Sequence, residues 1–212
     1  MTKRDLAAAL VAASLLIGPA VSAQWRPGGR MRIILLVDSS TTVSTMITHF
    51  RAGLADFLDE LPGDPEIAVV TTGGQLRLRV GPTSDRAALL AAARAFSSDG
   101  GGNSLLETLI EADQRFLKSA PDRRPVFVIL TTDNASGLGD VRVDAYNKFL
   151  DGFLARGGRA HAIVVRQLAS GMTSRIVENL TTNTGGFFEA VGLPNPVPKI
   201  MRTLAGYVAA DQ

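Results

Sequence analysis

The stretch that decides the fold is residues 33–37, IILLV, which is followed directly by residues 38–42, DSSTT. A strand that alternates apolar with polar residues keeps one face in water, whereas an unbroken apolar run is typical of a strand buried on both faces of a parallel sheet. A second run of this kind, VFVIL, occupies residues 126–130. These two segments therefore predict central strands of a buried, mostly parallel sheet.

Helical and strand patterns alternate outward from these two strands. Apolar residues recur at three- and four-residue steps from residue 43 to residue 61, which predicts a helix packed on the sheet. Thr72-Gly73-Gly74 predicts a turn, and the alternation of Leu with Arg after it predicts an antiparallel edge strand with one wet face. We expect further strands at 67–70, 76–80, 160–165 and 187–190, and further helices at 83–96, 104–117, 141–154, 172–180 and 199–208.

This order predicts an α/β fold with a doubly wound, mostly parallel sheet, helices on both faces and one antiparallel edge strand. In such folds ligands bind at the carboxyl ends of the strands. We therefore expect function in the loops after Val37, Phe96 and Leu130.

The first 23 residues have the pattern of a signal peptide. Lys3 and Arg4 precede an apolar run at residues 6–17, and Val21-Ser22-Ala23 fits a signal-peptidase site. A retained membrane anchor is the alternative, but the run is shorter than the roughly 20 residues that span a bilayer. We expect cleavage near Ala23, a lead-in at 24–30, a domain at 31–210 without a membrane span, and a periplasmic or extracellular location.

Composition excludes several classes of function. The 212 residues are 46% hydrophobic and carry a net charge of +2, which suits one globular domain and gives no basic excess for nucleic acid. Without cysteine the chain has no disulfide, thiolate metal site or cysteine nucleophile. The glycines at 100–102 lack the Gly-Lys-Ser/Thr ending of a phosphate loop, and no Gly-x-Ser-x-Gly elbow occurs, so we predict no catalytic residue.

Oxygen-bearing side chains follow both central strands. Asp38, Ser40 and Thr42 alternate after the first strand, where an extended loop would point them the same way, and Asp133 follows the second. Two carboxylates with two hydroxyls suit a hard cation such as Mg²⁺. Taken alone, DSSTT also fits a turn that caps the next helix.

Strand-DSSTT, a GGNS loop opening a helix and strand-TTDN together resemble the von Willebrand factor A (VWA) domain, over residues 31–210. The family's metal-ion-dependent adhesion site (MIDAS) uses Asp-x-Ser-x-Ser, a Thr on a second loop and an Asp on a third. The resemblance implies metal ligation by Asp38, Ser40, Thr42 and Asp133, with Asn103 at the position of the family's Thr. Asn134 stands where the family usually has Gly.

The implied function is binding of a protein partner through Mg²⁺ or Mn²⁺, with an acidic residue of the partner completing the coordination. Two alternatives remain open. The first is a metal-free interaction scaffold with a degenerate site, suggested by Asn103 and Asn134, and the second is a Mg²⁺-dependent hydrolase. Ser104, three residues before Glu107, predicts a capping box for the helix at 104–117 rather than a metal ligand.

Overall fold

A six-stranded sheet in the order β3-β2-β1-β4-β5-β6 forms the middle layer of the fold. The computed structural model describes residues 30–133, 143–166 and 171–211. Within them, β3 runs antiparallel to β2 at one edge, and the other neighbours are parallel. The strands are β1 (Met31–Val37), β2 (Glu66–Thr71), β3 (Arg77–Thr83), β4 (Arg124–Thr132), β5 (Arg159–Val165) and β6 (Phe188–Val191).

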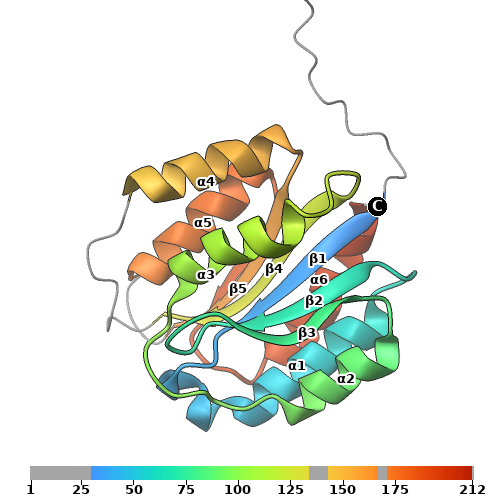
Figure 1. The fold of residues 1–212 in the computed structure, drawn as a ribbon. Coiled ribbons are helices and arrows are strands. Elements are labelled where there is room, and N and C mark those ends of the chain that lie inside the picture. Colours follow the sequence, from blue (N-terminus) through green and yellow to red (C-terminus); the bar gives the residue numbers. More distant parts are fainter. Residues whose placement is uncertain (1–29, 134–142, 167–170, 212) are drawn as a thin grey trace, which may run out of the picture.

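Helices cover both faces of the sheet (Figure 1). One hydrophobic core lies under α1, α2 and α6, and the other lies under α3, α4 and α5. Ile33, Leu35 and Val37 enter the first core while Ile34 and Leu36 enter the second, so β1 is buried on both sides as its sequence predicts. The helices are α1 (Ile47–Glu60), α2 (Arg86–Ala95), α3 (Leu105–Ala112), α4 (Val143–Ala155), α5 (Met172–Thr184) and α6 (Val197–Ala210).

The predicted fold class is confirmed, and the differences are local. An extended loop was expected through Thr42 and a helix from residue 43, but residues 41–45 form a 3-10 turn and α1 begins at Ile47. The turn is closed by the Val43 N–H, which donates to the Ser40 carbonyl at 3.1 Å. The helix expected at 104–117 ends as α3 at Ala112 and continues as a π-helical turn, Asp113–Leu117. None of the helices in the described ranges is long and apolar enough to cross a bilayer.

The strand register brings three segments to one level at the carboxyl edge of the sheet. Val37 of β1 pairs with Thr71 of β2 on one side and with Leu130 of β4 on the other. β4 continues beyond this level to Thr132, and the residues that follow the three strands emerge at the same edge, where the chain order reverses across β1. This is the position at which doubly wound folds bind ligands.

Candidate metal centre at the carboxyl edge of the sheet

Asp38 connects β1 to the end of β4. Its side chain is fully buried, and its backbone N–H donates to the Leu130 carbonyl at 2.9 Å. Oδ1 accepts the Ser40 N–H at 2.8 Å. Oδ2 accepts the Thr132 N–H at 3.1 Å and also the Thr132 hydroxyl. Asp38 therefore helps to hold the loops together, in addition to any role as a ligand.

Asn103 contacts Asp38 through nitrogen. Its Nδ2 donates to Asp38 Oδ2 at 3.1 Å, to Thr131 Oγ1 at 2.8 Å and to the Thr132 carbonyl at 3.3 Å, while its Oδ1 accepts the Thr72 hydroxyl at 2.7 Å. A carboxylate and a carbonyl only accept hydrogen bonds, so this network fixes which end of the amide faces Asp38. In this arrangement Asn103 does not offer an oxygen to a cation beside Asp38.

Asp133 lies against the first turn of α5. Its N–H donates to the Val165 carbonyl at 3.1 Å, and its Oδ2 accepts the Gly171 N–H at 2.7 Å. Gly171 is the N-cap of α5 and that helix has no acidic residue in its first turn, so the Asp133 carboxylate supplies the negative charge that a helix N-terminus favours. A Cβ on Gly171 would lie 2.5 Å from Asp133 Oδ1.

Two oxygen atoms at this edge are buried without a hydrogen-bond partner among the described residues: Ser40 Oγ and Asp133 Oδ1. Leaving a buried polar atom unsatisfied costs about 1–3 kcal/mol, so such atoms point to a water or an ion. Asp38 Oδ1 accepts only one described hydrogen bond, and Thr42 lies partly buried in the 3-10 turn.

These oxygens fit a hard cation, whereas the amide of Asn103, as oriented, does not. Within the described ranges no three His, Cys, Asp or Glu residues gather to hold a metal, so hydroxyls would have to supplement the two carboxylates. Asn134 lies outside the described residues.

The capping box predicted at Ser104 is wrong. Ser104 is the N-cap of α3, but its side chain makes no capping hydrogen bond. Its backbone N–H donates instead to the Thr72 carbonyl at 3.0 Å, so the group that Glu107 would have to bind in a capping box already has a partner.

Sequence reasoning missed Asp99, whose side chain is 7% exposed beside the candidate site. Its Oδ2 accepts the hydroxyls of Ser39 at 2.7 Å and Thr71 at 3.0 Å, and its Oδ1 pairs with Arg79. Burial disfavours the Asp99 charge, but the hydrogen bonds from Arg79, Ser39 and Thr71 and the Arg79 charge outweigh it, so the pKa of Asp99 lies below its usual value. No local pattern marks Asp99 in the sequence, because its partner Arg79 lies 20 residues away in β3.

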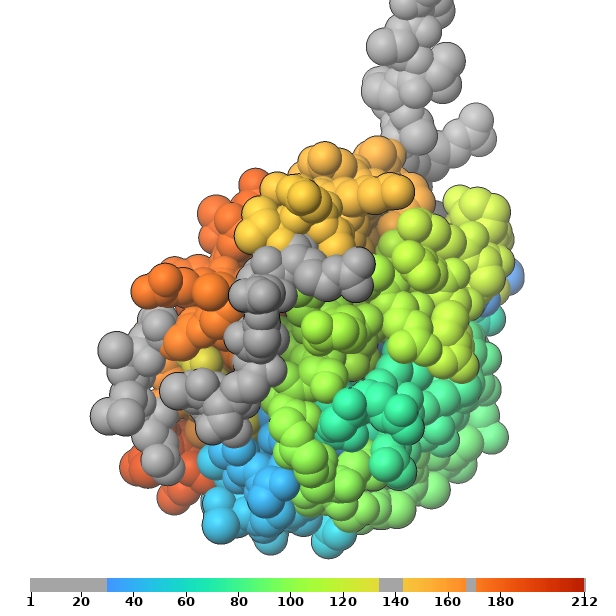
Figure 2. Space-filling view, turned by 60° about the vertical axis from the view of Figure 1, so that its left-hand side comes forward, coloured from blue at the N-terminus to red at the C-terminus, as the bar shows by residue number. Residues whose placement is uncertain are grey.

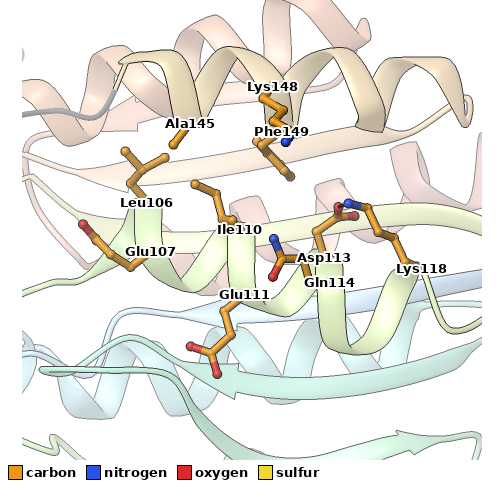
Figure 3. Close-up of a pocket in the computed structure, with 10 residues that line it drawn as sticks. All are labelled: Leu106, Glu107, Ile110, Glu111, Asp113, Gln114, Lys118, Ala145, Lys148 and Phe149. Atoms are coloured by element: carbon orange, nitrogen blue, oxygen red, sulfur yellow. Dashed lines mark ion pairs between the residues drawn. The ribbon is translucent and has the colours of Figure 1, made fainter.

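A cavity of about 400 Å³ lies apart from these residues, between α3 and α4. Figure 2 brings the face that carries these helices forward, and Figure 3 shows the apolar side chains of Leu106, Ile110 and Phe149 facing the cavity. Asp113 at its border pairs with Lys118 at 3.6 Å and with Arg156 at 2.6 Å. None of the predicted ligands lines this cavity.

Comparison with solved structures places the fold among VWA domains. A von Willebrand factor type A protein from Catenulispora acidiphila superposes with a TM-score of 0.70 at 14% identity, over 85% of this chain and 43% of that one. BatB from Bacteroides thetaiotaomicron gives 0.63 at 12% identity, over 86% and 100%. Manganese-loaded TRAP from Plasmodium vivax gives 0.57 at 14% identity, over 82% and 74%.

At these identities the structures show the fold alone, and the chain spans less than half of the first of them. A search of curated proteins found no match. A family model described as von Willebrand factor type A domain matches residues 3–136, which is more than half of the 212 residues. The chain therefore belongs to the von Willebrand factor type A domain family, whose members generally mediate protein interactions.

Proposed function

We propose that this domain binds a protein partner through one Mg²⁺ or Mn²⁺ ion held at the carboxyl edge of the sheet by Asp38, Ser40, Thr42 and Asp133. The observation that carries the proposal is the pair of buried oxygens without hydrogen-bond partners among the described residues, Ser40 Oγ and Asp133 Oδ1. When bound, the cation would supply a coordination position for an acidic side chain of the partner. The manganese-loaded state of the TRAP neighbour supports the choice of ion.

Each residue has a distinct part in the proposed site. Asp38 is held by Thr132 and Asn103, which leaves Oδ1 with room for a further contact. Asp133 is held by Gly171 through Oδ2, so its Oδ1 remains for the ion. Asn103 enters the proposal as a support of Asp38 and not as a ligand, because its nitrogen faces the carboxylate.

A metal-free interaction scaffold is the second candidate, and Asn103 is the observation that favours it. Its amide already links Asp38, Thr131, Thr132 and Thr72 without a cation. Both candidates describe binding and not catalysis, as is general in the family.

The proposal extends to location and boundaries. We propose that residues 1–23 direct export and are removed, and that the domain at 31–210 acts in the periplasm or outside the cell.

Electron paramagnetic resonance of free Mn²⁺, added to the chelator-stripped protein, tests the cation site. The proposal predicts one saturable Mn²⁺ per chain, displaced by Mg²⁺ and weakened by Asp133→Asn. Asp144→Asn, an exposed acidic position in the first turn of α4, is the matched control and should leave Mn²⁺ binding unchanged.

Acetate then serves as a minimal carboxylate probe. It should displace water from the bound Mn²⁺ and lower the water-proton relaxation that this ion produces. No saturable Mn²⁺ binding would favour the scaffold, and binding that survives Asp133→Asn would place the ion elsewhere.

A further inference from the structure

We propose that Asp99 is a positioning residue for the candidate metal site, which it supports by fixing Ser39 between Asp38 and Ser40. The proposal rests on the proposed function for its metal readout, and it also predicts an effect in the metal-free protein. Asp99 is not one of the predicted metal ligands.

Successive side chains in the loop after β1 contact two sets of residues, which meet at the bridge between Gly73 and Asn103. Asp38 contacts Thr132 and Asn103, whereas the Ser39 hydroxyl donates to Asp99 Oδ2 at 2.7 Å and accepts the Gly73 N–H at 2.9 Å. The contacts of Ser39 therefore hold the loop from the side of β2 and β3, while those of Asp38 hold it from the end of β4 and from the segment before α3.

The backbone of this loop is also held by residues 98–99. The Asp99 N–H donates to the Ser39 carbonyl at 2.7 Å. The Ser98 hydroxyl donates to the carbonyls of Ser39 at 3.1 Å and Ser40 at 3.0 Å. Ser40, whose hydroxyl has no partner among the described residues, therefore has its backbone fixed on both sides, by Asp38 at its N–H and by Ser98 at its carbonyl.

Asp99 is itself fixed to the edge of the sheet. Thr71, the last residue of β2, donates to its Oδ2, and Arg79 of β3 pairs with its Oδ1. Arg77 lies 3.9 Å from Oδ1. Gly73 packs closely on this loop, because a Cβ there would lie 2.7 Å from both Ser39 O and Ser39 Oγ. The Asp99 carboxylate thus connects β2 and β3 to the loop that carries the proposed ligands Asp38 and Ser40.

Asp113 provides a matched control for a merely structural carboxylate. Its side chain is 2% exposed and pairs with Arg156 at 2.6 Å and Lys118 at 3.6 Å, in the π-helical turn after α3. Its described side-chain contacts do not involve the loop after β1. Asp99→Asn and Asp113→Asn therefore make the same chemical change at two buried, ion-paired positions, of which only one supports the site.

The test measures Mn²⁺ affinity by calorimetry and amide hydrogen exchange of Ser40 without metal. Supporting residues around metal sites typically contribute 10- to 100-fold in affinity, so Asp99→Asn should weaken Mn²⁺ binding by about 10-fold or more. Amide hydrogen exchange at Ser40 should become about 10-fold faster, because its N–H is held less firmly against Asp38 Oδ1. Asp113→Asn should stay within about twofold of the parent in both measurements, as expected for a site without shared partners.

Ser39→Ala is the second variant, and it removes the link without altering the Asp99 charge. It should reproduce both effects, and the double variant with Asp99→Asn should add little to either. Equal Mn²⁺ affinity losses in Asp99→Asn and Asp113→Asn, or unchanged Ser40 exchange in Asp99→Asn, would overturn the proposal. If the parent protein binds no Mn²⁺, the proposed metal function fails, and the exchange measurement alone decides the role of Asp99.

Discussion

Asn103→Ala should destabilise the metal-free protein by about 3 kcal/mol. The side chain is 5% exposed and makes hydrogen bonds to Asp38, Thr131, Thr132 and Thr72. The bond to the Asp38 carboxylate is worth about 1.5–3 kcal/mol and the three neutral bonds contribute about 0.5–1.5 kcal/mol each, which sums to about 3–7.5 kcal/mol. Because water can enter the space left by the amide, we take the lower part of the summed range. For a chain of this size about 2–4 °C is lost per kcal/mol, so the melting temperature should fall by about 6–12 °C.

Urea unfolding of chelator-treated protein, followed by circular dichroism, measures this loss. Asn183→Ala is the control, because Asn183 is exposed and its amide makes one hydrogen bond, to the Asn179 carbonyl at 2.8 Å. That control should change the free energy of unfolding by no more than about 0.5 kcal/mol. A loss in Asn103→Ala below about 1 kcal/mol, or equal to that of the control, would refute the idea that Asn103 holds the loops together.

Three further perturbations test other parts of the structure. Gly171→Ala should place its Cβ against Asp133 Oδ1 and weaken Mn²⁺ binding by about 10-fold or more in calorimetry. The control Gly206→Ala adds its Cβ in open space and should leave Mn²⁺ binding unchanged. Equal Mn²⁺ affinities in the two variants would contradict the proposal that Asp133 is a metal ligand. Arg86→Met should lower the free energy of unfolding in urea by about 2 kcal/mol, because the guanidinium donates to three backbone carbonyls at the end of α1. A loss below about 0.5 kcal/mol would disprove this capping role. Because the pKa of Asp99 is lowered in the folded protein, its stabilising contribution is present above about pH 4 and is lost as the pH falls further. In urea unfolding from pH 6 to 3, the free energy of unfolding should therefore decline less steeply in Asp99→Asn than in the parent protein. An identical decline in the two proteins would contradict the lowered pKa.

The sheet could be predicted because its two central strands are recognisable from their unbroken runs of apolar residues. Residues 33–37 and 126–130 have no polar position, which is typical of strands buried on both faces. The edge position of β3 was also predicted, but Leu78 between Arg77 and Arg79 is 42% exposed, so the expected single wet face is wrong at the start of this strand. Strands that end at the same edge then place Asp38 and Asp133 near one another, whatever the details of the loops.

Loop conformation was less predictable because partners distant in sequence decide it. Thr41, Thr42 and Val43 are β-branched and poor helix formers, and the chain there adopts a 3-10 turn before α1 begins at Ile47. The capping box at Ser104 fails because the Thr72 carbonyl, from another loop, takes the backbone N–H.

The orientation of Asn103 and the role of Asp99 depend on contacts between several segments. Asn103 turns its nitrogen toward Asp38 because Thr132, at the end of β4, presents a carbonyl on the same side. Asp99 becomes a centre of the loop network only when β2 and β3 bring Thr71 and Arg79 to it. Neither arrangement has a local sequence pattern, so the family resemblance alone suggested an oxygen ligand at Asn103 and nothing at Asp99.

The most direct test of a metal site is a calorimetric titration of Mn²⁺ into the chelator-stripped parent protein and into Ser40→Ala. Ser40 Oγ has no hydrogen-bond partner among the described residues, so its removal should leave the metal-free melting temperature unchanged or slightly raised. If Ser40 is a ligand, the parent protein should bind Mn²⁺ saturably, and Ser40→Ala should bind it about 10-fold or more weakly. Equal Mn²⁺ affinity in the two proteins, or no binding in the parent, would contradict it.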